Sequence, residues 1–145
     1  MNLIESSYNP DILNCIADLS NDEIFTSPEL VNSILDNLPN KLWKDPNAKF
    51  LDPCSKTGVF LREIAKRLNE GLKDYIKNPQ KRSDHIFSNQ LFGISITELT
   101  SLMSRRTLYY SKNSKGKNSI CKNFKNNDGN IYFKNYSHIW KNNIC

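Results

Sequence analysis

The sequence predicts a doubly wound α/β domain, with helices before its first strand and a basic segment after its last helix. Two apolar runs, at residues 50–51 and 90–95, are each followed by a helical repeat of apolar residues, at 59–68 and 96–110. An Asp-Pro pair closes the first run, where proline removes a backbone donor and disfavours helical geometry before it. Strand, helix, strand, helix is the order of a doubly wound sheet, in which right-handed crossovers join parallel strands.

The segment 49–68 is the most informative part of the sequence, because it combines a buried strand, a turn and a helix. We expect Asp52 at the carboxyl end of the strand, where open α/β sheets bind their ligands. Gly58 is the only glycine of the turn, and it lets the backbone pass close to a bound group. The following helix would point its first N–H groups toward that group. The same pattern is equally typical of a strand-turn-helix whose Asp-Pro corner is purely structural.

Two helices are expected before the first strand. Residues 9–19 have helical spacing, and a second helix begins at Pro28 with Ser27 as its N-cap. The apolar stripe of this second helix consists of Leu30, Val31, Ile34, Leu35 and Leu38. Residues 39–48 are expected to connect it to the first strand.

The later part of the chain is more polar. Residues 71–89 are rich in lysine and are expected to form a loop or a frayed helix. After Ser111, two short strands at 119–124 and 130–133 could form a hairpin. From Lys112 to the last residue there are seven lysines and a single acid, interleaved with aromatic residues. This segment could follow a nucleic-acid backbone, or it could be a solvated surface of biased composition.

Composition excludes several classes of protein. The chain has 145 residues, 38% of them hydrophobic, a net charge of +5 and a mean hydropathy of −0.60. It contains no apolar stretch of membrane-spanning length, and its amino terminus lacks the pattern of a signal peptide, so we expect a cytoplasmic protein without membrane contacts. The four cysteines are widely spaced, without a Cys-x-x-Cys pair or a histidine at ligand spacing, so we expect reduced thiols and no metal site.

Three segments occur in a meaningful order: FTSP at 25–28, LDPCSKTGVFL at 51–61 and FGISITELTSLMSRRTLY at 92–109. Together they resemble the S-adenosylmethionine-dependent DNA methyltransferases of restriction-modification systems, in the gamma-type order. Members of this order mostly methylate the exocyclic amine of adenine. The resemblance implies part of a Rossmann-like class I methyltransferase fold, with residues 1–110 binding S-adenosylmethionine and residues 111–145 forming a basic extension.

The resemblance also implies a set of cofactor-binding residues. Phe25, Thr26 and Pro28 would line the methionine end of the cofactor, although Ser27 separates Thr from Pro where many relatives have Thr-Pro. The counterparts of the family's Asp-Pro, loop glycine and following aromatic residue are Asp52, Pro53, Gly58 and Phe60. The intervening residues 54–57, with the sequence C-S-K-T, depart from the glycine-rich A-C-G-S form of the family.

The contacts to the ribose and the adenine are less well matched. Relatives place an acid two residues after the glycine of the second strand, but this chain has Ser95 there, and its next acid is Glu98. Either Glu98 reaches back to the ribose or Ser95 makes a weaker contact, and Glu98 could equally be a first-turn acid favoured by the helix dipole. Asp128 could match the acid that contacts adenine, or it could belong to a plain turn.

The catalytic element of the family is absent from the sequence. An enzyme that modifies a base must flip it out of the duplex, and the family aligns the adenine amine with an Asn-Pro-Pro-Tyr-like motif. The chain has no Pro-Pro pair, so we assign no catalytic residue and expect a fragment that is inactive alone. Its partners would be DNA, through the full-length protein, and a restriction nuclease region or subunit. The alternatives are a non-catalytic nucleic-acid-binding or regulatory remnant, and a methyltransferase of RNA, protein or a small molecule.

Overall fold

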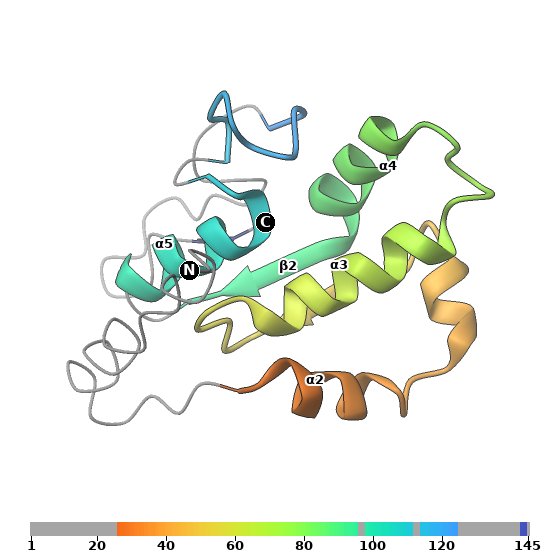
Figure 1. Cartoon of the computed structure of the whole chain (residues 1–145), viewed down its shortest axis with the longest axis horizontal. Helices are drawn as coiled ribbons and strands as arrows, with labels where there is room; N and C mark the ends of the chain where they lie inside the picture. Colours follow the sequence, from red (N-terminus) through yellow and green to blue (C-terminus); the bar gives the residue numbers. More distant parts are fainter. Residues whose placement is uncertain (1–25, 96–97, 112–113, 125–142, 145) are drawn as a thin grey trace, which may run out of the picture.

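The structure, a computed structural model, describes residues 26–95, 98–111, 114–124 and 143–144 (Figure 1). The helix expected at 9–19 and the strand expected at 130–133 lie outside these residues. None of the helices in the described part of the chain is long and apolar enough to cross a membrane. In chain order the elements are α2 (Pro28–Leu35), the 3-10 helix η1 (Asn40–Lys44), β1 (Phe50–Asp52), α3 (Val59–Gly71), α4 (Pro79–His85), the π-helix η2 (Ile86–Gln90), β2 (Leu91–Ile94), α5 (Glu98–Tyr109) and β3 (Asn143–Ile144).

The strands form one sheet in the order β1-β2-β3. β1 and β2 are parallel, with Phe50 beside Leu91 and Asp52 beside Gly93. The predicted succession of strand, helix, strand and helix, with a parallel strand pair, is therefore confirmed. β3 pairs with β2 in the antiparallel direction, so the sheet is mixed, which the sequence did not predict.

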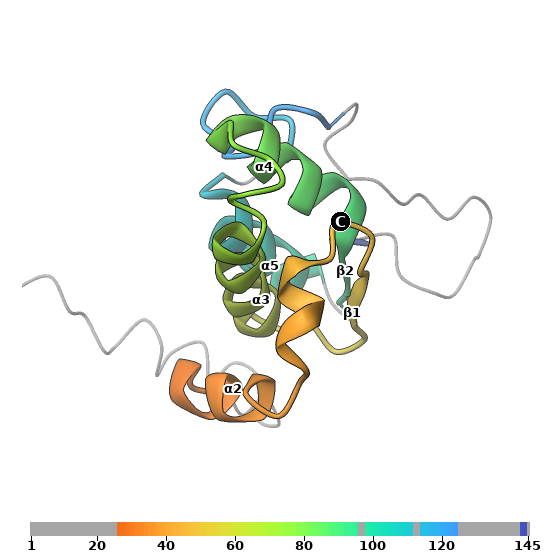
Figure 2. The ribbon, with the colours of Figure 1, turned by 90° about the vertical axis from the view of Figure 1, so that its right-hand side faces the viewer.

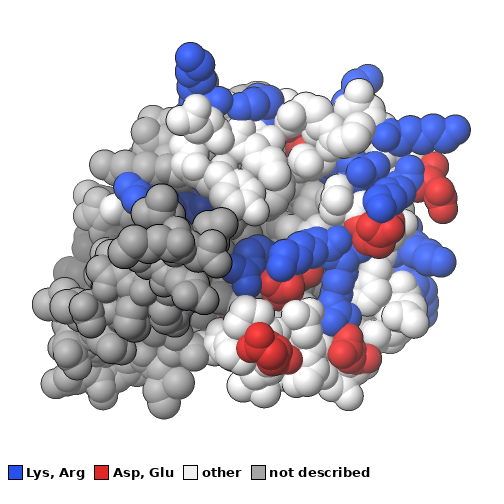
Figure 3. Space-filling model, viewed as in Figure 1, with Lys and Arg blue, Asp and Glu red and all other residues white. Residues whose placement is uncertain are grey.

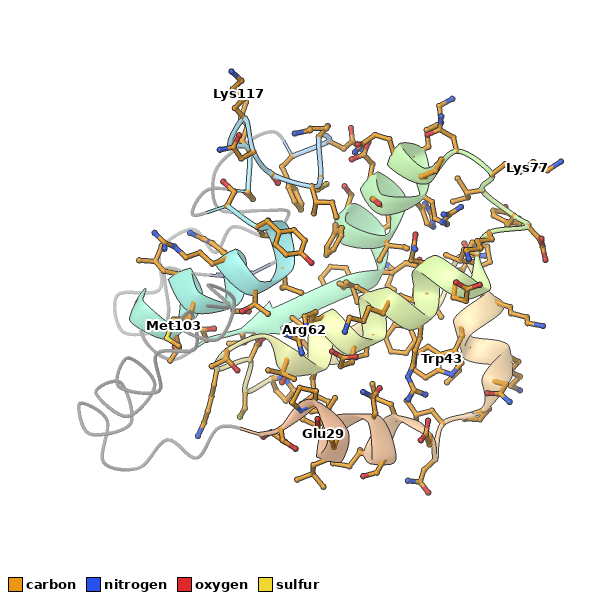
Figure 4. All side chains as sticks on the ribbon, in the orientation of Figure 1. Glu29, Trp43, Arg62, Lys77, Met103 and Lys117 are labelled. Atoms are coloured by element: carbon orange, nitrogen blue, oxygen red, sulfur yellow. The ribbon has the colours of Figure 1, made fainter. Side chains whose placement is uncertain are left out.

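Helix α3 covers one face of this sheet and organises the core (Figure 2). Its residues Leu61, Ile64 and Leu68 are buried at helical spacing, as the amphipathic pattern predicts. A methyl group on Gly93 of β2 would meet the Leu61 side chain at 2.7 Å, so helix and strand are in close contact. Trp43 of η1 is buried beside α3, and its ring stacks on Phe50 of β1 with centroids 5.4 Å apart (Figure 4).

The first strand is less buried than predicted. Leu51 is 61% exposed, because side chains alternate along a strand and this one lies on the face opposite α3. β1 is also an edge strand in the described sheet. The prediction of a buried strand was wrong because two apolar residues cannot reveal whether a neighbouring layer covers them.

Helix α2 begins where the sequence predicts, with the Ser27 hydroxyl accepting a hydrogen bond from the Leu30 N–H at 3.3 Å. Val31 and Leu35 are buried in the core, and α2 packs against α3. The rest of the predicted stripe, Leu30, Ile34 and Leu38, is exposed. Only one edge of the apolar stripe therefore contributes to the core.

Two polar clusters join α2 to α3. The Glu63 carboxylate, on a residue that is 4% exposed, accepts hydrogen bonds from Lys66 at 2.9 Å and from the Asn32 amide at 3.3 Å. Next to it, Arg67 of α3 pairs with Asp36 at 2.6 Å. These contacts hold the segment that precedes β1 against the helix that follows it.

The segment 71–89 contains more structure than predicted. Its polar composition indicated a loop or a frayed helix, yet α4 and η2 are both formed, with Ile86 and Phe87 buried. The Asn78 side chain caps α4 by accepting from the Lys81 N–H at 3.0 Å, and Pro79 occupies the first helical position. The Asn-Pro pair was thus a helix signal that the sequence interpretation missed.

The segment after α5 packs as irregular chain, not as a strand. Tyr109 is fully buried and makes edge-to-face contacts with Phe87 at 5.6 Å and Phe124 at 5.2 Å between ring centroids. The strand predicted at 119–124 is wrong, because this stretch forms no strand and the Ile120 N–H bonds to the Tyr109 carbonyl. The core contact of Phe124 replaces the predicted hairpin.

Candidate functional site

The turn between β1 and α3 lies at the carboxyl end of the parallel strand pair. Its backbone is held by short-range hydrogen bonds: the Cys54 N–H donates to Asp52 Oδ1 at 3.1 Å, and the Lys56 N–H donates to the Cys54 carbonyl at 2.8 Å. The Ser55 N–H donates to the Ile94 carbonyl of β2 at 2.9 Å. Hydrogen bonds within the turn and to the neighbouring strand therefore hold its backbone in place.

Three buried serines add a second set of tethers. The Ser95 hydroxyl donates to the Ser55 carbonyl at 2.8 Å, and the hydroxyls of Ser55 and Ser104 are 3.3 Å apart. Ser104 belongs to α5, so this network connects the turn to the second strand and to the helix after it. Buried hydroxyl and backbone groups that are satisfied in this way fix one conformation of the loop.

Gly58 is required at its position for two reasons. It has a left-handed backbone with φ of 75°, which other residues adopt at a cost. A Cβ built on it would lie 2.5 Å from the Ser104 hydroxyl and 3.1 Å from the Ser104 Cα. Gly58 is also the N-cap of α3, whose first N–H groups receive no side-chain cap. The positive end of this helix dipole is therefore open to a ligand.

A cavity of about 220 Å³ lies at this turn. It is smaller than the roughly 300–1,000 Å³ of a typical small-molecule site, so it suits one end of a larger ligand. Its walls come from Thr26, two residues before α2, the end of β1, the turn and the start of α3. The lining residues are Thr26, Asp52, Cys54, Lys56, Thr57, Gly58, Val59 and Phe60.

The chemistry of the cavity is set by two charged residues and two hydroxyls. Burial raises the pKa of Asp52, although hydrogen bonds from the Cys54 N–H and the Ser55 side chain act in the opposite direction. A cationic ligand group beside this carboxylate would compensate for the lost hydration. Lys56 supplies the opposite charge, and Thr26 and Thr57 supply hydroxyls. These charges are complementary to those of a ligand that carries both an ammonium and a carboxylate.

The structure brings some of the predicted cofactor-binding residues together. Thr26, Asp52, Gly58 and Phe60 line the cavity, whereas Pro28 and Pro53 are not among its lining residues. The Ser95 hydroxyl is used inside the protein to hold the turn, and a ribose contact stays a prediction. The three remaining predicted residues give no information on the cavity: Glu98 begins α5, while Phe25 and Asp128 lie outside the described residues.

Sequence reasoning missed several residues of the site. Cys54, Lys56 and Thr57 line the cavity, but their departure from the glycine-rich form had removed them from the predicted set. Ser104 was missed because it lies 49 positions from Ser55 in the chain. A usable signal was the row of small residues at Ser101 and Ser104, whose spacing marks one face of α5.

The face of the protein seen in Figure 3 carries both signs of charge. Lysine and arginine side chains lie next to acidic ones over α2 and α3, and the ion pairs of Glu63 with Lys66 and of Arg67 with Asp36 belong to this mixture. These two helices therefore do not form the uniformly basic surface that is typical of a nucleic-acid interface.

The similarity of the chain to known proteins is to a protein named as a methylase. No family model matches the sequence, and no solved structure matches it. Over 103 residues the chain is 47% identical to a protein of Mycoplasma pneumoniae (strain ATCC 29342 / M129) that is named as an uncharacterized adenine-specific methylase. The match covers 69% of this chain and 24% of that protein, so it extends over about a quarter of the length of this relative. The identity extends over most of this chain, so the two sequences are related over the matched segment.

Proposed function

We propose that this chain is the S-adenosylmethionine-binding part of an adenine-specific DNA methyltransferase, and that its sheet and helices are part of a Rossmann-like class I methyltransferase fold. The observation that carries the proposal is the cavity at the carboxyl end of the parallel strands, lined by Asp52, Gly58 and Phe60 of the cofactor-loop motif. The name of the Mycoplasma relative supports the choice of adenine as the target base. The restriction-modification context and the DNA substrate belong to the same proposal.

The donor set of the cavity fits one end of this cofactor. The methionine end of S-adenosylmethionine carries an ammonium and a carboxylate, and the cavity offers the Asp52 carboxylate, the Lys56 ammonium and the uncapped start of α3. When bound, the cofactor supplies an activated methyl group. The residues of this chain would bind it and fix its orientation, and the tethers on Ser55 would keep the turn in place.

The chemical step requires residues that this sequence does not contain. Methylation of an adenine amine needs a flipped base and hydrogen-bond acceptors that align the amine. No Asn-Pro-Pro-Tyr-like motif occurs in the chain. We therefore assign binding of the methyl donor to this chain and assign the transfer to other parts of the full enzyme.

The alternative of a nucleic-acid-binding remnant depends on the basic aromatic segment 112–145. Phe124, the first aromatic residue of this segment, is 4% exposed and packs on Tyr109, so it is not available for stacking on bases. The other aromatic residues of the segment lie outside the described residues. The described part of the chain therefore favours the methyltransferase.

Isothermal titration of the full chain with S-adenosylmethionine tests the proposal. We expect saturable binding by the wild type and weaker binding by Asp52→Asn, because the carboxylate that faces the cofactor ammonium is lost. Asp74→Asn is the matched control, since Asp74 is exposed beyond the far end of α3. Absence of binding by a chain whose circular dichroism shows it to be folded, with DNA binding retained, would contradict the proposed function.

A further inference from the structure

Lys56 has an unusual position in the candidate cofactor site. It stands where the A-C-G-S form of the family has its glycine, and it lines the cavity as a half-buried residue. It is also the one cation among the residues that line this cavity. A side chain therefore occupies a part of the turn where relatives of the glycine-rich form have none.

The ammonium group of Lys56 is not used in the ion pairs of the described residues. Those pairs involve Arg62, Lys66, Arg67 and Lys73, and none includes Lys56. Asp52, on the same cavity, takes part in none of these pairs either. Two opposite charges thus line one cavity without forming an ion pair with each other.

The backbone that carries Lys56 is held firmly. Its own N–H donates to the Cys54 carbonyl, and its neighbour Ser55 is bonded to Ile94, Ser95 and Ser104. The Cα atom of Lys56 is therefore held in place before an anion binds, which lowers the backbone part of the entropic cost of binding. The uncapped first turn of α3 contributes positive potential at the same place.

We propose that Lys56 binds the carboxylate of the cofactor's methionine end, while Asp52 faces the ammonium, so that this turn selects a zwitterionic amino-acid group by charge. The inference rests on the proposed function and names a contact within it. Hydrogen bonds between charged partners are stronger than neutral ones, and a partly enclosed cavity strengthens them further. Adenosine derivatives that lack the carboxylate would lose this contact alone.

The test compares two ligands on four proteins. S-adenosylmethionine and its decarboxylated analogue differ in the carboxylate, and their affinities are measured by titration calorimetry on the wild type, Lys56→Gln, Lys56→Arg and Lys77→Gln. Lys77 is the matched control, because it is an exposed lysine beyond the opposite end of α3 (Figure 4). Thermal unfolding of each variant establishes that it is folded.

We expect the wild type and Lys77→Gln to bind S-adenosylmethionine about 10- to 100-fold more tightly than the decarboxylated analogue, which is the range for one charged hydrogen bond. Lys56→Gln should lose this preference without weaker binding of the analogue, and Lys56→Arg should retain most of it. Equal weakening of both ligands, or an unchanged preference in Lys56→Gln, would overturn the role of Lys56 and leave the proposed function intact. If the folded wild type binds neither ligand, both the role of Lys56 and the proposed function fail.

Discussion

Replacing Gly58 with alanine is expected to destabilise the protein by about 2–4 kcal/mol, of which about 1–2 kcal/mol comes from the left-handed backbone and the rest from overpacking. The backbone part follows from the φ of 75° at this position. The packing part follows from the new Cβ, which would lie 2.5 Å from the Ser104 hydroxyl. Because α5 approaches the turn so closely, the substitution must move either the helix or the loop.

A double-mutant cycle with Ser104→Ala separates the two contributions. Without the hydroxyl, the closest atom to the new Cβ is the Ser104 Cα at 3.1 Å, a contact that a small shift relieves. Urea unfolding followed by circular dichroism should therefore show a favourable coupling of about 1–2 kcal/mol between the two substitutions, within the range for residues in contact. The remaining cost in the Ser104→Ala background should be that of the backbone alone.

Two results would refute this reasoning. If Gly58→Ala costs less than about 1 kcal/mol, the left-handed conformation is not required in solution. If Ser104→Ala does not reduce the cost, then α5 does not press on the turn as described. The Gly58→Ala protein should also bind S-adenosylmethionine more weakly, because the turn that carries Lys56 is displaced.

Three further predictions concern charge and packing. Burial opposes ionisation of Glu63, but hydrogen bonds from Lys66, Arg62 and Asn32 outweigh it and lower the pKa of this carboxyl below the ordinary 4.5. Glu63 therefore stabilises the fold above pH 4.5, and this contribution is lost as the pH falls through the folded pKa. Glu63→Gln should cost about 1–2 kcal/mol at pH 7 and flatten the loss of stability in acid, and an unchanged acid profile would contradict this. Because burial raises the pKa of Asp52, its negative charge disfavours folding at neutral pH. Asp52→Asn should therefore stabilise the chain by up to about 1 kcal/mol while weakening cofactor binding. A variant that is less stable than the wild type at pH 7 would contradict this. Leu51→Ser, on the exposed face of β1, should change the free energy of unfolding by less than about 0.5 kcal/mol, whereas Leu61→Ala in the core should lower it by about 2–5 kcal/mol. Urea unfolding measures both. Equal costs would show that a layer absent from the described residues covers β1.

The elements that the sequence predicts well are those with local signals. Helix α2 has its cap at Ser27 and its proline at the first position, and α3 has apolar residues at helical spacing. The elements that it predicts poorly depend on distant partners. Phe124 is in the core because it makes an edge-to-face contact with Tyr109, which lies far from it in the chain. No residue within 119–124 distinguishes this irregular segment from a strand.

The candidate site divides in the same way. Asp52, Gly58 and Phe60 were identifiable because strand end, turn and helix start are adjacent in sequence. The serine tethers were not, because they join residues that come together only when the second strand and α5 are in place. Ser95 illustrates the difference: a match by position suggested a ligand contact, and its hydroxyl is bonded to the Ser55 carbonyl.

The hydrogen bonds from Ser95 and Ser104 also explain how the turn keeps its shape with a single glycine. A glycine-rich loop adopts its shape because its residues have few steric restrictions, and it approaches a ligand with its backbone. In this chain only Gly58 needs a left-handed conformation among the turn residues, and the rest of the turn is held by bonds from Ile94, Ser95 and Ser104. Side chains can then project from the turn, and those of Lys56 and Thr57 line the cavity. Because the shape of the turn depends on Ser55 and Gly58, whereas its chemistry depends on Lys56 and Thr57, substitutions at the first pair should reduce stability and those at the second pair should change ligand affinity alone.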